Sequence, residues 1–360
     1  MGIHEQRSMW HGERMKMNKI PACLAVTLLL LALPSSASAQ DTDAFQSFLS
    51  QLRTQALAKG VSRATLDAVM PTLTYSARVV ALDRTQPGGN PNDPKAAIPK
   101  FAPYAAKHLG AQITATGRAK YQALRPLLAR VEQDTGVPES IMIAIWGHET
   151  NYGTITGNFD LANSLATLAF EGRRRALFTE EFIATLKMMD RGFPRETLKG
   201  SWAGATGYPQ FLPSVYIRLA KDGDGDGRAD IWNNQADALA SIANYFVSSG
   251  WRRGTGWGVK AIVPANFDRA AVVNRTISPR CPRVHARHSQ WKSVAEWRAL
   301  GVVPIGTKSL RDRDMATLLE PDGPGATAYL LTGNYRVILD YNCSNFYALS
   351  VGLLSDAVEK

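Results

Sequence analysis

The sequence predicts a mainly α-helical protein with a small mixed α/β subdomain, and two observations support this. First, apolar residues recur at helical spacing from residue 43 to about residue 250, with few interruptions. Second, two short runs beyond that point, 261–264 and 335–340, look like strands and are separated by polar loops. We therefore divide the chain beyond residue 39 into a helical core at 40–253, a mixed subdomain at 254–340, and a C-terminal helix at 341–360 that returns to the core.

The first 39 residues have the pattern of a secretory signal peptide. Lys16 and Lys19 precede an apolar run at 24–33, and Ala37-Ser38-Ala39 then supplies the small residues of a cleavage site. The apolar run is too short for a stable membrane span. Cys23 lies before this run and not at the cleavage point, so we expect no lipid anchor and no stable membrane anchor after signal removal. The sequence thus predicts a soluble, secreted, periplasmic protein.

The charge of the chain is clearly basic, with 41 Lys and Arg residues against 31 Asp and Glu, a formal net charge of +10. Residues 1–39 carry four basic and two acidic side chains, so the mature chain keeps +8. In an exported protein this favours a polyanionic partner outside the cytoplasm, such as a cell wall with peptide carboxylates, over nucleic acid.

Two cysteines, Cys281 and Cys343, remain after the signal peptide is removed. An even pair in an oxidising compartment predicts one disulfide between them. The alternative is a pair of unbonded buried thiols. A bridge would hold the segment around Cys343 against the mixed subdomain.

The pattern of the N-terminal half predicts a series of helices with clear boundaries. Gly60 ends the first helix, and Ser62 has the character of a cap for the next. The Pro- and Gly-rich stretch 85–99 predicts an exposed loop. A long helix is expected at 101–133, after which Gly136-Val137-Pro138 turns the chain into the next helix.

That next helix begins at Pro138 and is apolar on every side from Ile141 to Trp146, which predicts burial all round. It should end near Gly153, so Glu149 lies in or beside its last turn. The helix dipole and the apolar neighbours there both disfavour negative charge and raise a carboxyl pKa. A carboxylic acid kept protonated near neutral pH is what a general acid for glycosidic cleavage needs. The alternative is an ordinary Glu that reaches solvent.

Downstream of Glu149 the sequence offers groups that could hold a substrate. A helix at 161–170 is followed by three arginines at 173–175, which are either a solvated face or a means to position an anionic substrate. The segment 199–214 is rich in glycine and is either a helix-packing segment or a sugar-binding loop. The second reading rests on an aromatic face and neutral hydrogen-bonding groups, namely Trp202, Ser201, Tyr208 and Gln210.

Three segments together, 146–153, 204–214 and 341–348, resemble the lytic murein transglycosylase B family. Their order and approximate spacing match over residues 42–356. The resemblance implies a lysozyme-like helical catalytic core and a peptidoglycan lytic transglycosylase, a carbon-oxygen lyase acting on polysaccharide. Such an enzyme cuts the β-1,4 bond between N-acetylmuramic acid and N-acetylglucosamine and leaves 1,6-anhydromuramoyl ends without using water.

The resemblance also explains why no convincing second carboxylate accompanies Glu149, since hydrolytic glycosidases generally use a pair. It implies that Glu149 is the single acid and base and that the sugar's own C6 hydroxyl is the nucleophile. It further implies substrate contacts from Ser201, Gln210, Tyr245, Tyr341, Asn342 and Tyr347, with Arg174 and Arg175 on the substrate side of the groove.

The alternatives are a lysozyme- or chitinase-type hydrolase, or a catalytically silent wall-binding protein. The expected partners are peptidoglycan glycan strands, together with proteins of cell-wall synthesis or turnover.

A second motif, at 222–233, follows the EF-hand loop, with aspartates at its first, third, fifth and ninth positions and Gly227 at its sixth. Asn233 departs from the pattern, because a bidentate Glu is expected at the twelfth position, unless Asp237 folds back to complete the shell. The family has a related calcium loop, so we expect a structural Ca²⁺ here and no cofactor in catalysis; a polar Asp-Gly turn is the alternative. The expected ligands are Asp222, Asp224, Asp226, the carbonyl of Arg228, and Asp237.

Overall fold

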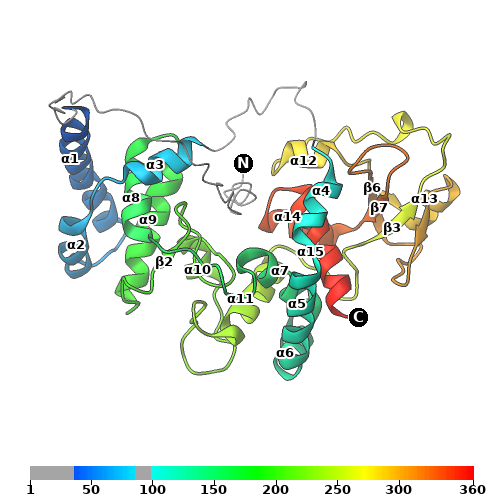
Figure 1. Ribbon diagram of the computed structural model, residues 1–360, viewed down its shortest axis with the longest axis horizontal. Helices are drawn as coiled ribbons and strands as arrows, with labels where there is room; N and C mark the ends of the chain where they lie inside the picture. Colours follow the sequence, from blue (N-terminus) through cyan, green and yellow to red (C-terminus); the bar gives the residue numbers. More distant parts are fainter. Residues whose placement is uncertain (1–35, 86–98) are drawn as a thin grey trace, which may run out of the picture.

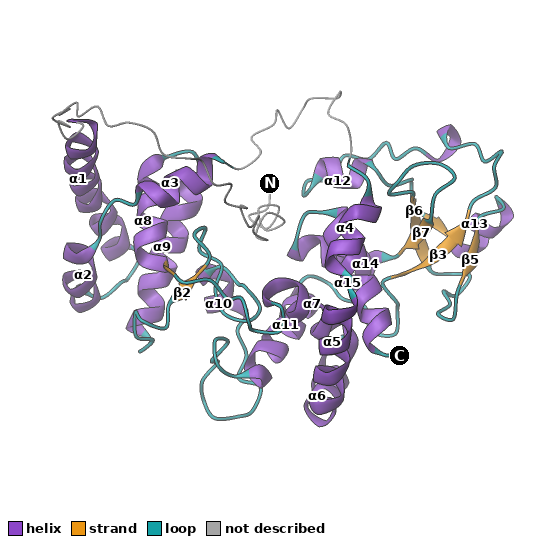
Figure 2. Ribbon diagram, in the orientation of Figure 1, coloured by secondary structure: helices purple, strands orange, loops and turns teal. Residues whose placement is uncertain are grey.

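The computed structural model describes residues 36–85 and 99–360, with side chains from residue 43 (Figure 1). The predicted signal peptide and the predicted loop at 85–99 fall almost wholly outside these residues. Helices dominate, and the strands of the larger sheet gather at one end of the molecule (Figure 2), as expected for a mainly α protein with a small mixed part. The helices before this sheet are α1 (Ser36–Ala58), α2 (Arg63–Val69), α3 (Ala77–Arg84), α4 (Phe101–His108), α5 (Ala111–Ala123), α6 (Arg125–Thr135), α7 (Glu139–Thr150), α8 (Leu161–Glu171), α9 (Arg175–Asp190), α10 (Pro213–Leu219) and α11 (Gln235–Ser248).

The large core is built around α7, whose residues from Ile141 to Trp146 are at most 2% exposed. Helices α5, α6 and α11 pack against it, as does the C-terminal helix α15 (Asn345–Val358). In Figure 1, α8 and α9 stand on one side of the molecule and α4, α14 (Gly333–Tyr341) and α15 on the other, with α7 between them. A helix that is apolar all round is therefore buried all round, as its sequence predicts.

The sheet of the small part has five antiparallel strands in the order β4-β6-β7-β3-β5. Its central strand β7 (Ala328–Leu331) alternates between two cores, because Ala328 and Leu330 pack into a small one and Tyr329 and Leu331 into the large one. The sheet is thus sandwiched between the helical body and the short helix α13 (Val294–Ala299). The remaining elements here are β3 (Gly258–Ile262), α12 (Pro282–Ala286), β4 (Lys292–Ser293), β5 (Val303–Ile305) and β6 (Met315–Leu319), and a separate pair, β1 (Phe159–Asp160) with β2 (Lys199–Gly200), lies in the helical part.

Two predictions of local structure are wrong. The run 335–340, expected as a strand, is helix α14, which Thr332 caps by accepting a hydrogen bond from the Asn334 N–H. The reason is that Asn334, Val337, Ile338 and Tyr341 are all buried and have the i, i+3, i+4, i+7 spacing of one helical face. A short apolar run is compatible with both the helical and the strand periodicity.

The single helix expected at 101–133 is also wrong, because the structure has three helices there, α4, α5 and α6. The first break is at Gly110, which is extended and caps α5. The second is at Leu124, just before Pro126 in the first turn of α6. Proline fits a first turn but not a helix interior, so the chain has to restart there.

Other predictions of local structure are confirmed. The first helix ends just before Gly60, which has a φ of +86°, and the Ser62 hydroxyl accepts a hydrogen bond from the Thr65 N–H at 3.1 Å. A strand is found where 261–264 predicted one, beginning slightly earlier. No helix among the described residues is long and apolar enough to cross a membrane.

Cys281 and Cys343 form the predicted disulfide. It joins the residue before α12 to the short segment between α14 and α15, and so ties the small part of the molecule to the start of α15. The two cysteines are 62 residues apart in sequence. Closing a loop of this size restricts the unfolded chain considerably.

We therefore expect that replacing both cysteines by serine lowers the free energy of unfolding by about 2–4 kcal/mol. Urea denaturation of the oxidised wild-type protein and the double variant measures the difference. A reducing agent should destabilise the wild type and leave the variant unchanged. Equal stability of the two proteins under oxidising conditions would contradict the prediction.

Candidate active site

Helix α7 ends in a tight left-handed turn that is held in place by helix α5. Asn151 and Tyr152 have φ angles of +48° and +57°, and the Tyr152 hydroxyl donates to the Ile113 carbonyl on α5 at 2.9 Å. Gly147 and Gly117 lie against the Tyr152 side chain, so that a Cβ at these positions would come within 2.6 and 2.3 Å of it. Both glycines are needed for this close approach. The last turn of α7, which carries Glu149, is thereby locked to α5.

Glu149 is 7% exposed and accepts a hydrogen bond from the Tyr347 hydroxyl at 2.7 Å, on Oε1. Tyr347 lies in the first turn of α15, where Ser344 caps the helix by accepting from the Tyr347 N–H at 3.3 Å. The packing of α15 on α7 thus brings together two residues that are far apart in the sequence. A buried carboxyl group held by a tyrosine hydroxyl can exchange a proton in a fixed position.

Two cavities of about 640 and 790 Å³ meet at Glu149, and His108 and His148 line both of them as well. We name them the α12 cavity and the Ser201 cavity. Beyond the shared residues, the α12 cavity is lined mainly by Lys100, Tyr104, Arg283, Arg287, Asn342, Phe346 and Tyr347. The Ser201 cavity is lined mainly by Arg78, Lys107, Ile113, Asn151, Phe159, Ser201, Trp202 and Gln210. An extended polymer could therefore lie on both sides of one acid.

Two side chains that lie near Glu149, His148 and Tyr104, are uncharged near pH 7. Burial, with a smaller contribution from neighbouring His108, lowers the pKa of His148 to about 3, so its imidazole is uncharged. Burial raises the pKa of Tyr104 to about 12, so its phenol keeps its proton. The Tyr104 ring stacks on His108 with the ring centres 4.1 Å apart. Flat aromatic faces such as that of Tyr104 suit the apolar side of a sugar ring.

Four of the residues expected to contact substrate line the cavities: Ser201, Gln210, Asn342 and Tyr347. Gln210 has a φ of +54°, and its Nε2 donates to the carbonyls of Thr156 and Gly207 at 3.1 and 2.8 Å. The Ser201 hydroxyl accepts from the Ala205 N–H at 3.0 Å. Both side chains are therefore held in one orientation before any ligand arrives.

Tyr245 and Tyr341, which were expected beside them, line neither cavity. The Tyr245 hydroxyl donates to the Asp340 carbonyl at 2.7 Å, and the Tyr341 hydroxyl donates to the Pro209 carbonyl at 2.6 Å. Their rings pack edge to face, 4.7 Å apart. Tyr341 therefore holds the loop that carries Gln210, through the Pro209 carbonyl, and Tyr245 packs against Tyr341.

Arg174 and Arg175 also lie outside both cavities. The Arg174 guanidinium pairs at 2.7 Å with Asp83, which is 1% exposed, and a buried carboxylate needs such a partner. Arg175 lies over the Phe48 ring and donates to the Phe170 carbonyl at 3.0 Å. These arginines hold α1, α3 and α8 together, and their predicted contact with a substrate stays a prediction.

The sequence analysis did not identify the cationic residues that line the cavities. They come from scattered segments, namely Arg78, Lys100, Lys107, Arg283 and Arg287. The one available signal was the spacing of four between Arg283 and Arg287, which places two side chains on one face of a helix. His108 and His148 were missed as well, although His148 lies directly before Glu149.

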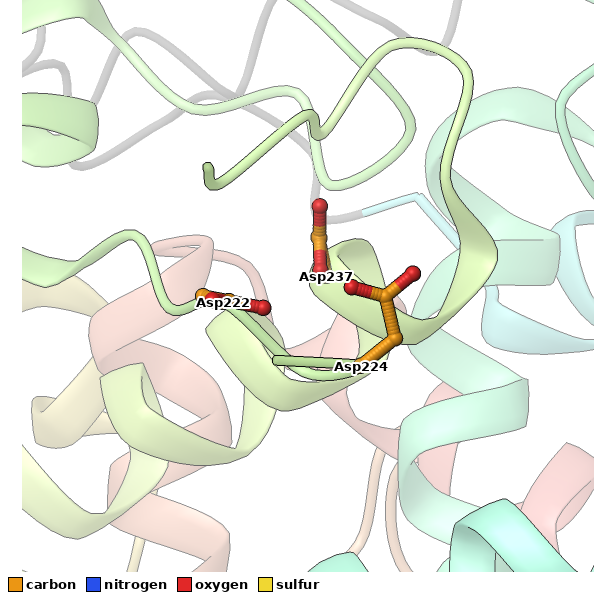
Figure 3. A group of neighbouring side chains, drawn as sticks. All are labelled: Asp222, Asp224 and Asp237. Carbon is orange, nitrogen blue, oxygen red and sulfur yellow. The ribbon is translucent and has the colours of Figure 1, made fainter. Parts of the chain in front are cut away.

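The EF-hand-like loop brings the carboxylates of Asp222, Asp224 and Asp237 together, with one oxygen of each within 4.8 Å of the others (Figure 3). Asp237 folds back onto the loop and accepts from the N–H groups of Gly223 and Asp230 at 2.8 and 2.7 Å. Burial raises the pKa of Asp237. Together, two carboxylates of the loop and one from the start of α11 form an oxygen donor set that fits a hard cation such as Ca²⁺.

Asp226 is not a member of this group. Its carboxylate accepts from the Arg228 N–H at 2.8 Å.

A buried histidine, His288, supports the wall of the α12 cavity. Its two ring nitrogens lie 2.9 Å from the Thr317 hydroxyl on β6 and 2.8 Å from the Asn345 amide oxygen at the start of α15. The Asn345 amide nitrogen in turn donates to the Val284 carbonyl in α12 at 3.0 Å. Burial lowers the pKa of His288 to about 4.

This histidine makes the stability depend on pH. An unfolded histidine has a pKa of about 6.5. Below that pH, His288 is protonated in the unfolded state, whereas in the folded state it stays neutral down to about pH 4. The free energy of unfolding should therefore fall as the pH drops through this range. Between pH 7 and 4.5, a His288→Gln variant should lose about 2–3 kcal/mol less than the wild type. Urea denaturation at the two pH values tests this, and equal losses would contradict it.

Comparison with known proteins places these observations in a family. The family model "Transglycosylase SLT domain" matches residues 44–356. Membrane-bound lytic murein transglycosylase B of Escherichia coli (strain K12) is 35% identical over 234 residues, which are 64% of this chain and 60% of that protein's length. SltB3 of Pseudomonas aeruginosa, solved with NAG-anhNAM-pentapeptide, is 35% identical, with a TM-score of 0.76 over 88% of this chain and 79% of that one.

The lytic transglycosylase Slt35 of Escherichia coli, solved in complex with calcium, is a further similar structure. It is 28% identical, with a TM-score of 0.68 over 88% of this chain and 93% of that one.

Proposed function

Because the chain belongs to the transglycosylase SLT domain family, we propose that it is a lytic transglycosylase of peptidoglycan, with the lysozyme-like helical core of that family. It cleaves the β-1,4 bond between N-acetylmuramic acid and N-acetylglucosamine and leaves 1,6-anhydromuramoyl ends. The observation that carries this proposal is the position of Glu149, buried, bonded to Tyr347 and set where two cavities meet. The similar protein SltB3 has been solved with a ligand that contains such an anhydro sugar.

Glu149 acts twice in this reaction. Its carboxyl group gives a proton to the glycosidic oxygen as the bond from C1 of the muramic acid to that oxygen breaks. The resulting carboxylate then takes the proton of the C6 hydroxyl as O6 bonds to C1, which restores the acid and consumes no water. The Tyr347 hydroxyl, which donates to Oε1, stabilises the carboxylate between the two steps.

Ser201, Gln210 and Asn342 serve as neutral contacts for the sugars, on opposite sides of Glu149. Charged groups would be less suitable here, because they would need to be desolvated against a neutral sugar. Tyr245 and Tyr341 act indirectly, by holding the loop of Gln210. The enzyme works on glycan strands, and proteins of wall synthesis or turnover are its expected partners.

The periplasm is the compartment in which this activity belongs. The signal-peptide pattern of residues 1–39 and the basic charge of the mature chain support it. The disulfide between Cys281 and Cys343 agrees with an oxidising compartment.

A hydrolase of the lysozyme or chitinase type is less well supported. Such enzymes generally use two carboxyl groups on either side of the cleaved bond. Among the described residues that line the two cavities, Glu149 is the only carboxylate. Mass spectrometry of digested peptidoglycan separates the two reactions, because hydrolysis adds one water to each new end and transglycosylation adds none.

We expect Glu149→Gln to lower the release of anhydro-muropeptides by several hundred-fold or more, because the amide can neither give nor take the proton. The matched control is Glu139→Gln, the same change in the same helix but at its opposite end, where Glu139 pairs with Arg125. This control should keep most of the activity. A Glu149→Gln protein as active as the wild type would overturn the role of Glu149 as acid and base, whereas no release by either protein would favour a wall-binding role.

We also propose that the loop at 222–233 binds Ca²⁺ through Asp222, Asp224 and Asp237, in a structural role. The three clustered carboxylates support this assignment, as does the calcium complex of the similar protein Slt35. The ion would neutralise carboxylates that otherwise repel one another and would fix the loop to the start of α11. Asp226 and the Arg228 carbonyl, the other ligands expected from the motif, would complete the shell only after the loop adjusts.

Calcium should accordingly raise the melting temperature of the wild-type protein and have much less effect on an Asp224→Asn variant. Differential scanning calorimetry with calcium or with a chelator measures both shifts. Asp67→Asn, the same change at an exposed residue of α2, is the control and should respond like the wild type. Equal shifts in all three proteins would remove the loop from the explanation.

A further inference from the structure

The α12 cavity has a cationic wall that the transglycosylase reaction itself does not explain. Arg283 and Arg287 lie four residues apart on the α12 segment, and Lys100 lines the same cavity from the start of α4. Apart from Glu149, no carboxylate is found among the described residues that line it. A glycan backbone is uncharged, so these cations point to a charged substituent on the strand.

Arg287 is the most informative member of this wall. Its Nη2 donates to the Pro321 carbonyl at 2.9 Å, and its guanidinium lies 5.7 Å from the centre of the Phe346 ring. Burial lowers the pKa of Arg287, but the group stays charged at neutral pH. Among the described residues, no ion pair within 4 Å involves Arg287. A half-buried guanidinium of this kind favours an anionic ligand, because a carboxylate can compensate its loss of water.

The wall is fixed in position relative to Glu149. Cys281, directly before α12, is bonded to Cys343, which lines the cavity itself. The Asn345 amide holds the Val284 carbonyl from the start of α15, the helix that also supplies Tyr347. The backbone that carries the two arginines is therefore fixed before binding, which lowers the entropy cost of binding a ligand and helps the site to discriminate between substrates.

We propose that the α12 cavity binds the carboxylates of the peptide attached to muramic acid, and that Arg283 and Arg287 make the enzyme prefer strands whose peptides carry free carboxylates. This inference rests on the proposed function. We assign the negative charge to the peptide and not to the sugar, because the lactyl carboxyl group of a substituted muramic acid forms an amide bond and is therefore uncharged.

The test compares two forms of one substrate: glycan strands with their native peptides, and the same strands after chemical amidation of the peptide carboxylates. Wild-type enzyme should show a kcat/KM about tenfold to a hundredfold higher on the native strands, the range expected for one or two charge-assisted contacts. Arg287→Gln and Arg283→Gln should lower kcat/KM on native strands towards the value for amidated strands. On amidated strands the two variants should differ from the wild type far less than they do on native strands.

Arg283→Glu provides a second and more demanding variant, because Arg283 is exposed and its replacement should not disturb folding. The reversed charge should make amidated strands the better substrate. The control is Arg298→Gln, an exposed arginine on α13 that pairs with Asp312 and should keep the wild-type preference. Melting temperatures of all variants show whether Arg287→Gln still folds.

The outcomes separate this inference from the proposed function. Equal kcat/KM of the wild type on both forms, or a preference that survives in Arg283→Glu, overturns the role of the wall and leaves the transglycosylase activity intact. Absence of anhydro products from both forms overturns the proposed function itself.

Discussion

The hydrogen bond from Tyr347 to Glu149 is the contact on which the site depends. It joins residues 198 positions apart, one at the end of α7 and the other at the start of α15. For the two to meet, α15 has to pack along α7 and its first turn has to be capped by Ser344. The fully apolar face of α7 makes this packing favourable, since burying each large side chain contributes about 1.5–3 kcal/mol. The hydrophobic core and the position of the acid are therefore set by the same two helices.

The small part of the molecule matters to the site through the way it is attached. Its central strand β7 faces the large core with Tyr329 and Leu331, so the sheet cannot move independently of the helices. The disulfide at Cys343 and the network around His288 then fix α12 against the beginning of α15. One wall of the α12 cavity thus comes from the mixed subdomain and the other from the helical core. Neither part alone would form the cavity.

A feature of the site could be predicted from the sequence where the residues that determine it are neighbours in the chain. The burial of α7 and the place of Glu149 in it can be read from a dozen consecutive residues. Tyr347 could be assigned only through resemblance, because nothing near it in the sequence indicates an acid 198 positions away. The ion pair of Arg174 could not be predicted for the same reason: its partner Asp83 is distant in the sequence, and an arginine gives no local sign of what it pairs with.

The supporting tyrosines and the helix α14 show two further limits. Whether a tyrosine contacts a sugar or supports the loop behind it depends on what its hydroxyl meets, and for Tyr341 this is the carbonyl of Pro209. The run 335–340 has both strand and helical periodicity, and only the core against which it packs decides between them. Local preference is a weak guide where tertiary contacts are strong.

Backbone strain in this protein is concentrated where the substrate is expected. Among the described residues, the non-glycine residues with a positive φ are Asn151, Tyr152, Gln210 and Cys281. Asn151 and Gln210 line the Ser201 cavity, Tyr152 holds the end of α7, and Cys281 precedes the wall of the α12 cavity. Each such conformation costs about 1–3 kcal/mol and persists only when its surroundings impose it. Here the surroundings are identifiable, since Tyr152 is bonded to Ile113, Gln210 to two carbonyls and Cys281 to Cys343. The core thus supplies the free energy that keeps the groove in one shape, which is the requirement for placing a single carboxyl group against both the bond it breaks and the hydroxyl it activates.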